Sequence, residues 1–310
     1  MRLIVDKEEI SCHNNLKRIR PIKEGNGMTL DEDYALTEAR NHKVVKDNRL
    51  IQKVTRRKYE LTAQEQKIIG FIISLIKPPK DATEKPQYRY TFDVRTFCKV
   101  CGLNYDSGKN YADVKAALQK IADNGFWIDE GDSELYFQWI VSPRIYKKTG
   151  KVSVRITEEV MPYLWNLRER FVAYELYQTL AMKSTYSIEL FELLKSYAFR
   201  KKITVSIDDL RKYFGLGDKY KAYRDFKRRV VDPAVKEINE YTDLFVSYDP
   251  VRRGNPFVAL TFTIEKKGSW EGLESYRRAM AEMNGLRHSP GQVNLFEFPE
   301  VKSGDQEEQQ

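Results

Sequence analysis

The sequence has no long apolar run. Nowhere in its 310 residues do apolar side chains approach the roughly 20 consecutive positions that a helix needs to cross a bilayer. The first ten residues also lack the apolar core and the small-residue cleavage site of a secretion signal. We therefore expect a cytoplasmic protein with no membrane partner.

Cysteine and histidine are scarce, with three of each. An odd cysteine count in a long chain without a secretion signal argues against a disulfide framework. Cys98 and Cys101 have the spacing of metal ligands, but only Cys12 and His13 are available to complete the four ligands of structural zinc. The histidines are too dispersed for the paired-histidine metal site of a nicking enzyme, and the G-x-x-x-x-G-K-[ST] phosphate loop is missing. We expect no metal, no cofactor and no enzymatic activity.

Basic residues are in excess. Lys and Arg number 53 against 45 Asp and Glu, which gives a formal charge of +8 and favours a polyanionic partner such as nucleic acid. Hydrophobic residues make up 41% of a chain longer than one usual domain, which is enough for more than one core. Two globular domains are therefore expected.

The polarity pattern divides the chain into four segments. These are a flexible N-terminal arm at 1–40, a first domain at 41–158, a second domain at 159–267 and a flexible C-terminal tail at 268–310.

The pattern of residues 42–57 predicts a basic helix at the start of the first domain. Thr62 and Glu65 predict a capping box for the next helix, because they are three positions apart before an apolar run. A joining segment at 157–167 precedes a strand at 171–177 and a helix at 185–198.

An internal repeat is the most informative feature. Residues 92–103 align with residues 205–216, and each copy predicts a strand end, a short helix and a Gly-Leu exit with glycine as the left-handed cap. A second helix follows each copy, starting near 111 and 223, and a hairpin follows each helix. The hairpins are expected at 126–156, with a turn at 148–151, and between 244–248 and 257–264. The sequence thus predicts an α+β fold of two tandem winged-helix domains related by a degenerate repeat.

The second helix of the second domain predicts a DNA-reading surface. Its apolar positions form a stripe expected to face the core, namely Phe226, Val230, Ala234 and Ile238. Stepping 100° per residue puts basic side chains on the opposite face and its flanks, namely Lys221, Arg224, Lys227, Arg228 and Arg229. Arginine can bind guanine through two hydrogen bonds, so Arg224 and Arg228 are expected to read bases and the others to bind phosphates. The alternative is a charged face that only meets solvent.

A hairpin and a proline mark the limits of this expected DNA-reading surface. Residues 249–256 are expected to form the tip of a wing, where Arg252 and Arg253 would touch the DNA backbone or minor groove. Pro233 must kink the helix or begin a new one, because its ring removes a hydrogen bond and crowds the preceding turn. The turns that read DNA are therefore expected before Pro233.

The equivalent helix of the first domain is less suited to DNA. Val114, Leu118 and Ile121 are expected to face inward. The expected outer positions are Asp113, Ala116, Ala117 and Lys120, which make a poor phosphate-binding surface. The first domain would then contact DNA through the basic segment 42–57, or would serve mainly as a protein contact surface. The sequence leaves both open.

Several segments resemble the Rep-type initiator proteins of theta-replicating, iteron-containing plasmids. They are residues 44–51, 61–67, 186–194, 226–239 and 241–244, which together span residues 42–266 in the order of the family. The resemblance implies a protein that binds repeated origin sites as a monomer and melts the origin with the host initiator and replicative helicase. It also implies a dimer, joined through the first domain, that represses the protein's own gene. The family's recognition helix corresponds to residues 221–229.

A short peptide in the tail is similar to the Gln-x-x-Leu-Phe motif by which bacterial replication proteins bind the sliding clamp. Here Gln292, Leu295 and Phe296 hold the motif positions, and residues 289–291 form a leader. The alternative is a short strand packed on the second domain. The alternative function is that of a winged-helix transcriptional regulator with no role in replication. Direct repeats in the DNA beside the gene would favour the initiator, whereas a lone palindrome would favour the regulator.

Overall fold

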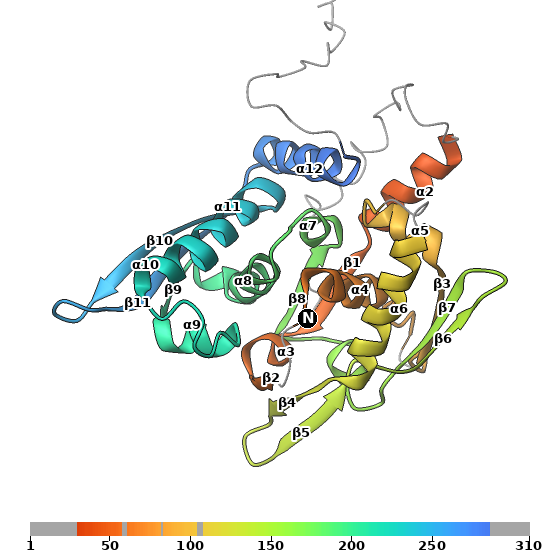
Figure 1. Cartoon of the computed structure of the whole chain (residues 1–310), viewed down its shortest axis with the longest axis horizontal. Helices are drawn as coiled ribbons and strands as arrows, with labels where there is room; N and C mark the ends of the chain where they lie inside the picture. Colours follow the sequence, from red (N-terminus) through yellow and green to blue (C-terminus); the bar gives the residue numbers. More distant parts are fainter. Residues whose placement is uncertain (1–29, 58–60, 82, 104–107, 286–310) are drawn as a thin grey trace, which may run out of the picture.

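The computed structural model describes residues 30–285, apart from 58–60, 82 and 104–107. Figure 1 shows a first winged-helix unit beside a second one, with α7, α8 and β8 between them. The helices of the first half are α2 (Leu30–Arg40), α3 (Arg49–Gln52), α4 (Ala63–Ser74), α5 (Val94–Val100) and α6 (Gly108–Asp123). Its strands are β1 (Lys43–Asp47), β2 (Val54–Arg57), β3 (Arg89–Asp93), β4 (Gly125–Asp129), β5 (Glu134–Gln138), β6 (Ile140–Tyr146) and β7 (Lys151–Ile156).

The second half begins with a short 3-10 turn, η1 (Met161–Tyr163). It continues with β8 (Phe171–Glu175), α7 (Tyr177–Leu180), α8 (Thr185–Ser196), η2 (Ala198–Arg200), β9 (Lys202–Ser206), α9 (Ile207–Tyr213), α10 (Tyr223–Phe226), the π-turn η3 (Lys227–Val231), α11 (Asp232–Tyr241), β10 (Leu244–Arg252), β11 (Phe257–Lys266) and α12 (Ser269–Met283). The strand at 171–177 and the helix at 185–198 predicted from sequence are both present as β8 and α8.

The basic helix predicted at 42–57 is wrong. This segment is strand β1, the single turn α3 and strand β2. Strand β1 pairs antiparallel with β8, with Val44 opposite Tyr174, and β2 pairs with β4. Pairing with strands far along the chain buries Val44 completely, and tertiary burial of this kind overrides a local helical pattern.

The first unit packs its helices on two small antiparallel sheets. The sheet orders are β2-β4-β5 and β3-β7-β6. The ring of Phe71 on α4 meets the edges of Phe92 and Phe97 at centroid distances of 5.1 and 5.2 Å. The predicted inner face of α6 is buried, but Ala117 is buried as well, at 7% exposure, and not an outer position.

The internal repeat is confirmed down to its capping hydrogen bonds. Asp93 accepts a hydrogen bond from the Thr96 backbone N–H at the start of α5, and Ser206 caps α9 in the same way. Both helices end at a glycine in the left-handed region, with φ +68° at Gly102 and +61° at Gly215. The backbone N–H of the residue after each glycine, Leu103 or Leu216, donates to a carbonyl of the preceding helix at 2.8 or 3.0 Å. The two helices therefore end in the same way. The capping box of α4 is also present.

Two docked helices replace parts of the arms predicted as flexible at 1–40 and 268–310. Arg40 at the end of α2 is buried, and its guanidinium donates to the backbone oxygens of Lys99 and Val100 and to Asn284 Oδ1. Helix α12 packs on α7 and α11, with Ala279 and Met283 buried. A polar segment can pack on the fold through one buried, hydrogen-bonded cation, as in α2, or through one narrow apolar strip, as in α12. Amino-acid composition does not reveal either feature. Residues 1–29 and 286–310, including the peptide at 292–296, lie outside the described residues.

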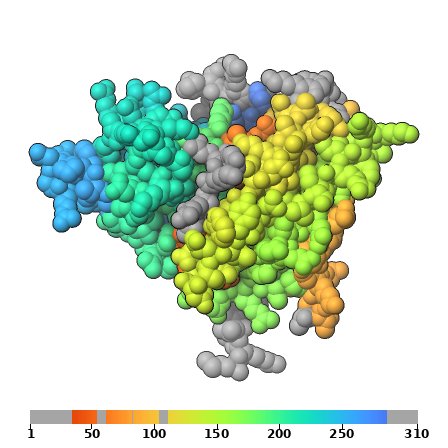
Figure 2. All heavy atoms as spheres, turned by 60° about the horizontal axis from the view of Figure 1, so that its bottom comes forward, coloured from red at the N-terminus to blue at the C-terminus, as the bar shows by residue number. Residues whose placement is uncertain are grey.

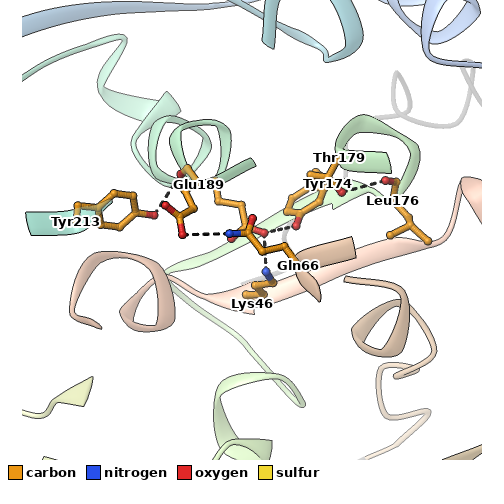
Figure 3. Close-up of polar contacts among 8 residues, drawn as sticks. Lys46, Gln66, Tyr174, Leu176, Thr179, Glu189 and Tyr213 are labelled. Atoms are coloured by element: carbon orange, nitrogen blue, oxygen red, sulfur yellow. Dashed lines mark hydrogen bonds and ion pairs between the residues drawn. The ribbon is translucent and has the colours of Figure 1, made fainter. Parts of the chain in front are cut away.

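A buried polar cluster joins the first unit to α8. Lys46 Nζ on β1 lies 2.5 Å from Glu192 on α8, and the Tyr174 hydroxyl donates to the same carboxylate. Gln66 on α4 donates to Glu189 at 3.1 Å, as Figure 3 shows. Helix α11 packs on the other side of α8. The second unit is therefore attached to the first through a central helix and not through a loose linker.

The two described cysteines are packing residues. Cys98 and Cys101 are buried. Burial raises the pKa of the Cys98 thiol to about 11 and that of Cys101 to about 12. No helix in the described part of the chain is long and apolar enough to cross a membrane. Nor do three His, Cys, Asp or Glu residues gather around a possible metal position in that part.

Candidate nucleic-acid interface

The recognition helix of the second unit has one buried and one basic side, as predicted. The four stripe residues Phe226, Val230, Ala234 and Ile238 are at most 1% exposed. On the other side Lys221, Arg224, Arg228 and Arg229 are exposed, and Lys227 is half-buried. Burial of the stripe fixes the rotation of the helix, so the cations must face away from the core.

Pro233 changes the helix where it was expected to. A π-turn, η3, lies directly before α11, in which proline is the second residue. Proline has no N–H to donate to the preceding turn, and the wider π-turn absorbs that lost bond. All of the predicted helix cations from Arg224 to Arg229 lie before this proline, on α10 and the π-turn.

The turn that precedes the recognition helix is held by Arg211, a residue that sequence reasoning did not select. Its guanidinium donates to the backbone oxygens of Gly217, Lys219 and Tyr220 at 3.1, 2.6 and 2.5 Å. Gly217 and Tyr220 both have positive φ, so the turn is tight and needs external support. The guanidinium of Arg229 lies 5.7 Å from the centre of the Tyr220 ring, which places this cation against the same turn.

The wing is longer and its tip shorter than predicted. Strand β10 continues through Pro250 to Arg252, so the tip is reduced from 249–256 to residues 253–256. Proline is tolerated because β10 is the edge strand of the sheet β10-β11-β9. Arg252 at the end of β10 and Arg253 in the tip are exposed, and Gly254 makes the turn with φ +69°. Figure 2 shows the wing projecting at one end of the molecule.

An aromatic stack joins the wing to the recognition helix. The rings of Tyr223 on α10 and Phe257 on β11 stack with centroids 4.1 Å apart, and the Arg252 guanidinium lies 4.1 Å from the Phe257 ring centre. The stack brings the wing arginine to the same side as the start of the recognition helix. Tyr223 and Phe257 carried no sequence signal beyond being aromatic.

A second link holds the middle of the recognition helix to the wing. Lys227 Nζ lies 2.8 Å from Asp232, and the Tyr248 hydroxyl on β10 donates to the same carboxylate at 2.5 Å. The hydrogen bonds from Lys227 to Asp232 and Tyr248 raise the pKa of the lysine to about 12. This lysine is therefore always charged, but it is partly neutralised by Asp232, and Arg228 beside it likewise lies 3.1 Å from Asp225.

Among the described residues, helix α6 of the first unit does not carry an equivalent basic face. The only basic residues of α6 are lysines, and Lys120 near its end lies 3.0 Å from Glu65. In the segment predicted as a basic helix, Lys46 is in the buried pair with Glu192, and Arg49 lies 2.9 Å from Asp47. Three cations that the sequence offered for DNA in this unit are thus paired within the fold, whereas Lys43 and Lys53 are exposed.

The geometry defines a class of protein. In each unit a short helix, a tight exit and a second helix are followed by a hairpin, and the second unit exposes arginines on its recognition helix and wing. This arrangement is the winged helix-turn-helix of DNA-binding proteins, and the chain has two in tandem.

Comparison with known proteins gives the family. The model of the initiator replication protein winged-helix domain 1 matches residues 43–195, and that of the initiator Rep protein winged-helix domain 2 matches residues 206–264. The chain belongs to this family of replication initiators. The first match runs past the predicted boundary between residues 158 and 159, a division that stays a prediction.

Two relatives agree with this assignment. A replication initiation protein of Escherichia coli is 22% identical over 235 residues, which are 74% of this chain and 72% of that protein. A crystal structure of the Pi initiator protein in complex with iteron DNA superposes with a TM-score of 0.60 at 19% identity, covering 74% of this chain and 99% of that one. The superposition shows the shared fold.

Proposed function

We propose that this protein initiates plasmid replication by binding repeated double-stranded origin sites, mainly through its second winged-helix unit. The observation that carries the proposal is the exposed basic ridge of the recognition helix, which lies beside the wing arginines on one rigid support. The family membership and the iteron DNA bound by the Pi initiator support the same function. The protein acts by binding and assembly and not as an enzyme.

The basic residues have different roles in the proposed complex. Arg224 and Arg228 read base edges in the major groove, since each is exposed and arginine can bind guanine through two hydrogen bonds. Lys221, Lys227 and Arg229 bind phosphates on either side. Arg252 and Arg253 contact the backbone or minor groove, and stacking on Phe257 orients Arg252 in advance.

Other partners follow from the family resemblance. The protein works with the host initiator and the replicative helicase to open the origin, and a dimer joined through the first unit represses its own gene. Gln292, Leu295 and Phe296 bind the sliding clamp. Each of these contacts is a separate proposal that DNA binding alone does not test.

Plasmid maintenance tests the central claim. The protein is supplied in trans to a plasmid whose only origin is the DNA beside its gene, and wild type is compared with Arg224→Ala plus Arg228→Ala. Losing two base contacts of about 1–3 kcal/mol each lowers origin affinity at least 30-fold and abolishes maintenance. The matched control is Lys77→Ala plus Lys80→Ala, which removes two exposed charges from a distant loop.

Two results would count against the proposal. Replication by the double arginine variant at the wild-type level would remove the recognition helix from origin binding. Wild-type protein that binds this DNA but never maintains the plasmid in a suitable host would instead indicate a transcriptional regulator.

A further inference from the structure

The first unit has an open groove that the proposed DNA contacts do not use. It lies between α6 and β6 and has a volume of about 790 Å³. Its apolar lining consists of Leu118, Ala122, Val141, Pro143 and Ile145. Lys115, Lys147 and Asp123 border it and are exposed, so basic residues outnumber acidic ones at the rim. An apolar floor with a basic rim suits a segment that is apolar and acidic.

One wall of the groove can pair with another strand. Among the strands that the structure describes, β6 is the last in the order β3-β7-β6 and has no strand on its outer side. Its register with β7 is irregular between Val141 and Arg144, and Ser142 has a φ of +50°. The irregularity and Pro143, which has no N–H, interrupt this edge, so an added segment would pair with the regular part of β6 at Arg144–Tyr146, and side-chain pockets then select which segment binds.

The chain's own C-terminal segment has the matching composition. Residues 293–298 read Val-Asn-Leu-Phe-Glu-Phe, so four of the six are apolar. From residue 293 to the end there are five acidic residues and one lysine. This charge complements the lysines at the rim of the groove.

The tether is long enough. Met283, the last residue of α12, lies against Gly102 at one end of α5, so close that a side chain on Gly102 would meet Met283 O at 2.2 Å. At the other end of α5, the Val94 N–H donates to Gly150 in the turn that follows Lys147. The seven residues of α5 span only about 10 Å at 1.5 Å per residue. Residues 286–292 reach about 23 Å when extended, which is enough to bring residue 293 to the groove.

We propose that residues 293–298 occupy the groove between α6 and β6 in the free protein, with the segment paired along β6. Leu295 and Phe296 are then buried in the same chain and withheld from any other partner, which includes the sliding clamp of the proposed function. The docking itself requires neither DNA binding nor clamp binding.

Hydrogen exchange on the full chain tests the proposal. In Leu295→Ser plus Phe296→Ser plus Phe298→Ser, the backbone amides of residues 141–147 should exchange at least tenfold faster than in wild type. Lys115→Glu plus Lys147→Glu should have the same effect, because it repels the acidic segment without touching the apolar floor. Val301→Ser is the matched control in the tail and should leave exchange unchanged.

A peptide experiment separates docking in cis from other occupants. A fluorescein-labelled peptide of residues 289–301 should bind the triple serine variant, whose groove is open. It should bind wild type only weakly, because the tethered segment already fills the groove. Equal exchange in wild type and triple variant would overturn the proposal. Protection of residues 141–147 that appears only as protein concentration rises would also overturn it, since a second copy would then fill the groove.

Discussion

At the scale of single residues, the DNA-binding surface depends on side chains that make no contact with DNA in the proposed complex. Arg211 sits on α9, yet it fixes the turn at 217–220 that sets where the recognition helix begins. The sequence offered Arg211 only as one more cation on a short helix. Its three carbonyl partners become visible only when the turn folds back over α9.

Arg211→Met should loosen this turn. We expect the free energy of unfolding to fall by on the order of 1–2 kcal/mol, since three partly exposed hydrogen bonds from a charged group are lost while the apolar stem is kept. Origin affinity should fall as well, because the start of the recognition helix becomes mobile. Urea denaturation and fluorescence anisotropy with origin DNA measure the two effects.

The neighbouring lysine is the control for this prediction. Lys212→Met removes the same charge from an exposed position on the same helix and should leave stability within about 0.5 kcal/mol of wild type. If the Arg211 and Lys212 variants are equally stable, the guanidinium does not hold the turn.

At the scale of elements, α8 connects the two units. Lys46 and Glu192 are 8% and 14% exposed, so their ion pair is largely removed from water. Glu192 also accepts from Tyr174, and α11 packs on the opposite side of α8. This buried pair, together with the hydrogen bond from Gln66 to Glu189, therefore helps to set the position of the recognition helix relative to the first unit.

Removing one partner of the pair should be more harmful than removing both. We expect Lys46→Met to cost about 3–5 kcal/mol of unfolding free energy, because a buried carboxylate loses its counter-charge. The double variant Lys46→Met plus Glu192→Gln should recover much of this loss, since glutamine is neutral and still accepts from Tyr174. Urea denaturation of the four proteins in the cycle measures the coupling.

An exposed pair provides the comparison. Arg155 and Glu158 lie 2.6 Å apart but are 45% and 67% exposed, so Arg155→Met should cost no more than about 1 kcal/mol. Equal costs for Arg155→Met and Lys46→Met would show that burial does not strengthen the pair on α8.

At the scale of the whole molecule, the basic residues of the two units differ in how far they are available to a partner. In the second unit, the arginines of the recognition helix and wing are exposed, and even the paired cations Lys221 (with Asp218) and Arg228 (with Asp225) are 72% and 62% exposed. In the first unit, Lys46, Arg49 and Lys120 are paired with carboxylates of the fold. The net charge of +8 thus predicts the partner class but not where on the molecule the partner binds.

The salt dependence of DNA binding should reflect this distribution. Each phosphate contact contributes about 0.9 to the slope of log K against log salt concentration, so Lys221→Ala and Arg229→Ala should each lower the slope by about that amount. Binding isotherms over a series of salt concentrations give the slopes. An unchanged slope in both variants would exclude these residues as phosphate contacts, and Lys77→Ala is the control that should leave it unchanged.

Features that are local or repeated could be predicted from neighbouring residues alone. The repeat at 92–103 and 205–216 predicted both short helices, because helix caps and glycine exits are set by neighbouring residues. The spacing of Phe226, Val230, Ala234 and Ile238 predicted which side of the recognition helix is buried, because a helix has a fixed period. Pro233 predicted the break for the same local reason.

Features that depend on distant partners were set by the packing of the folded chain. Residues 43–47 became a strand because β8 was there to pair with them, and α2 and α12 docked because buried carbonyls and a narrow apolar strip received them. Whether a cation such as Lys46 is exposed or neutralised depends on a carboxylate 146 residues away. Sequence patterns report spacing along the chain, whereas pairing and charge neutralisation are set by distances in space.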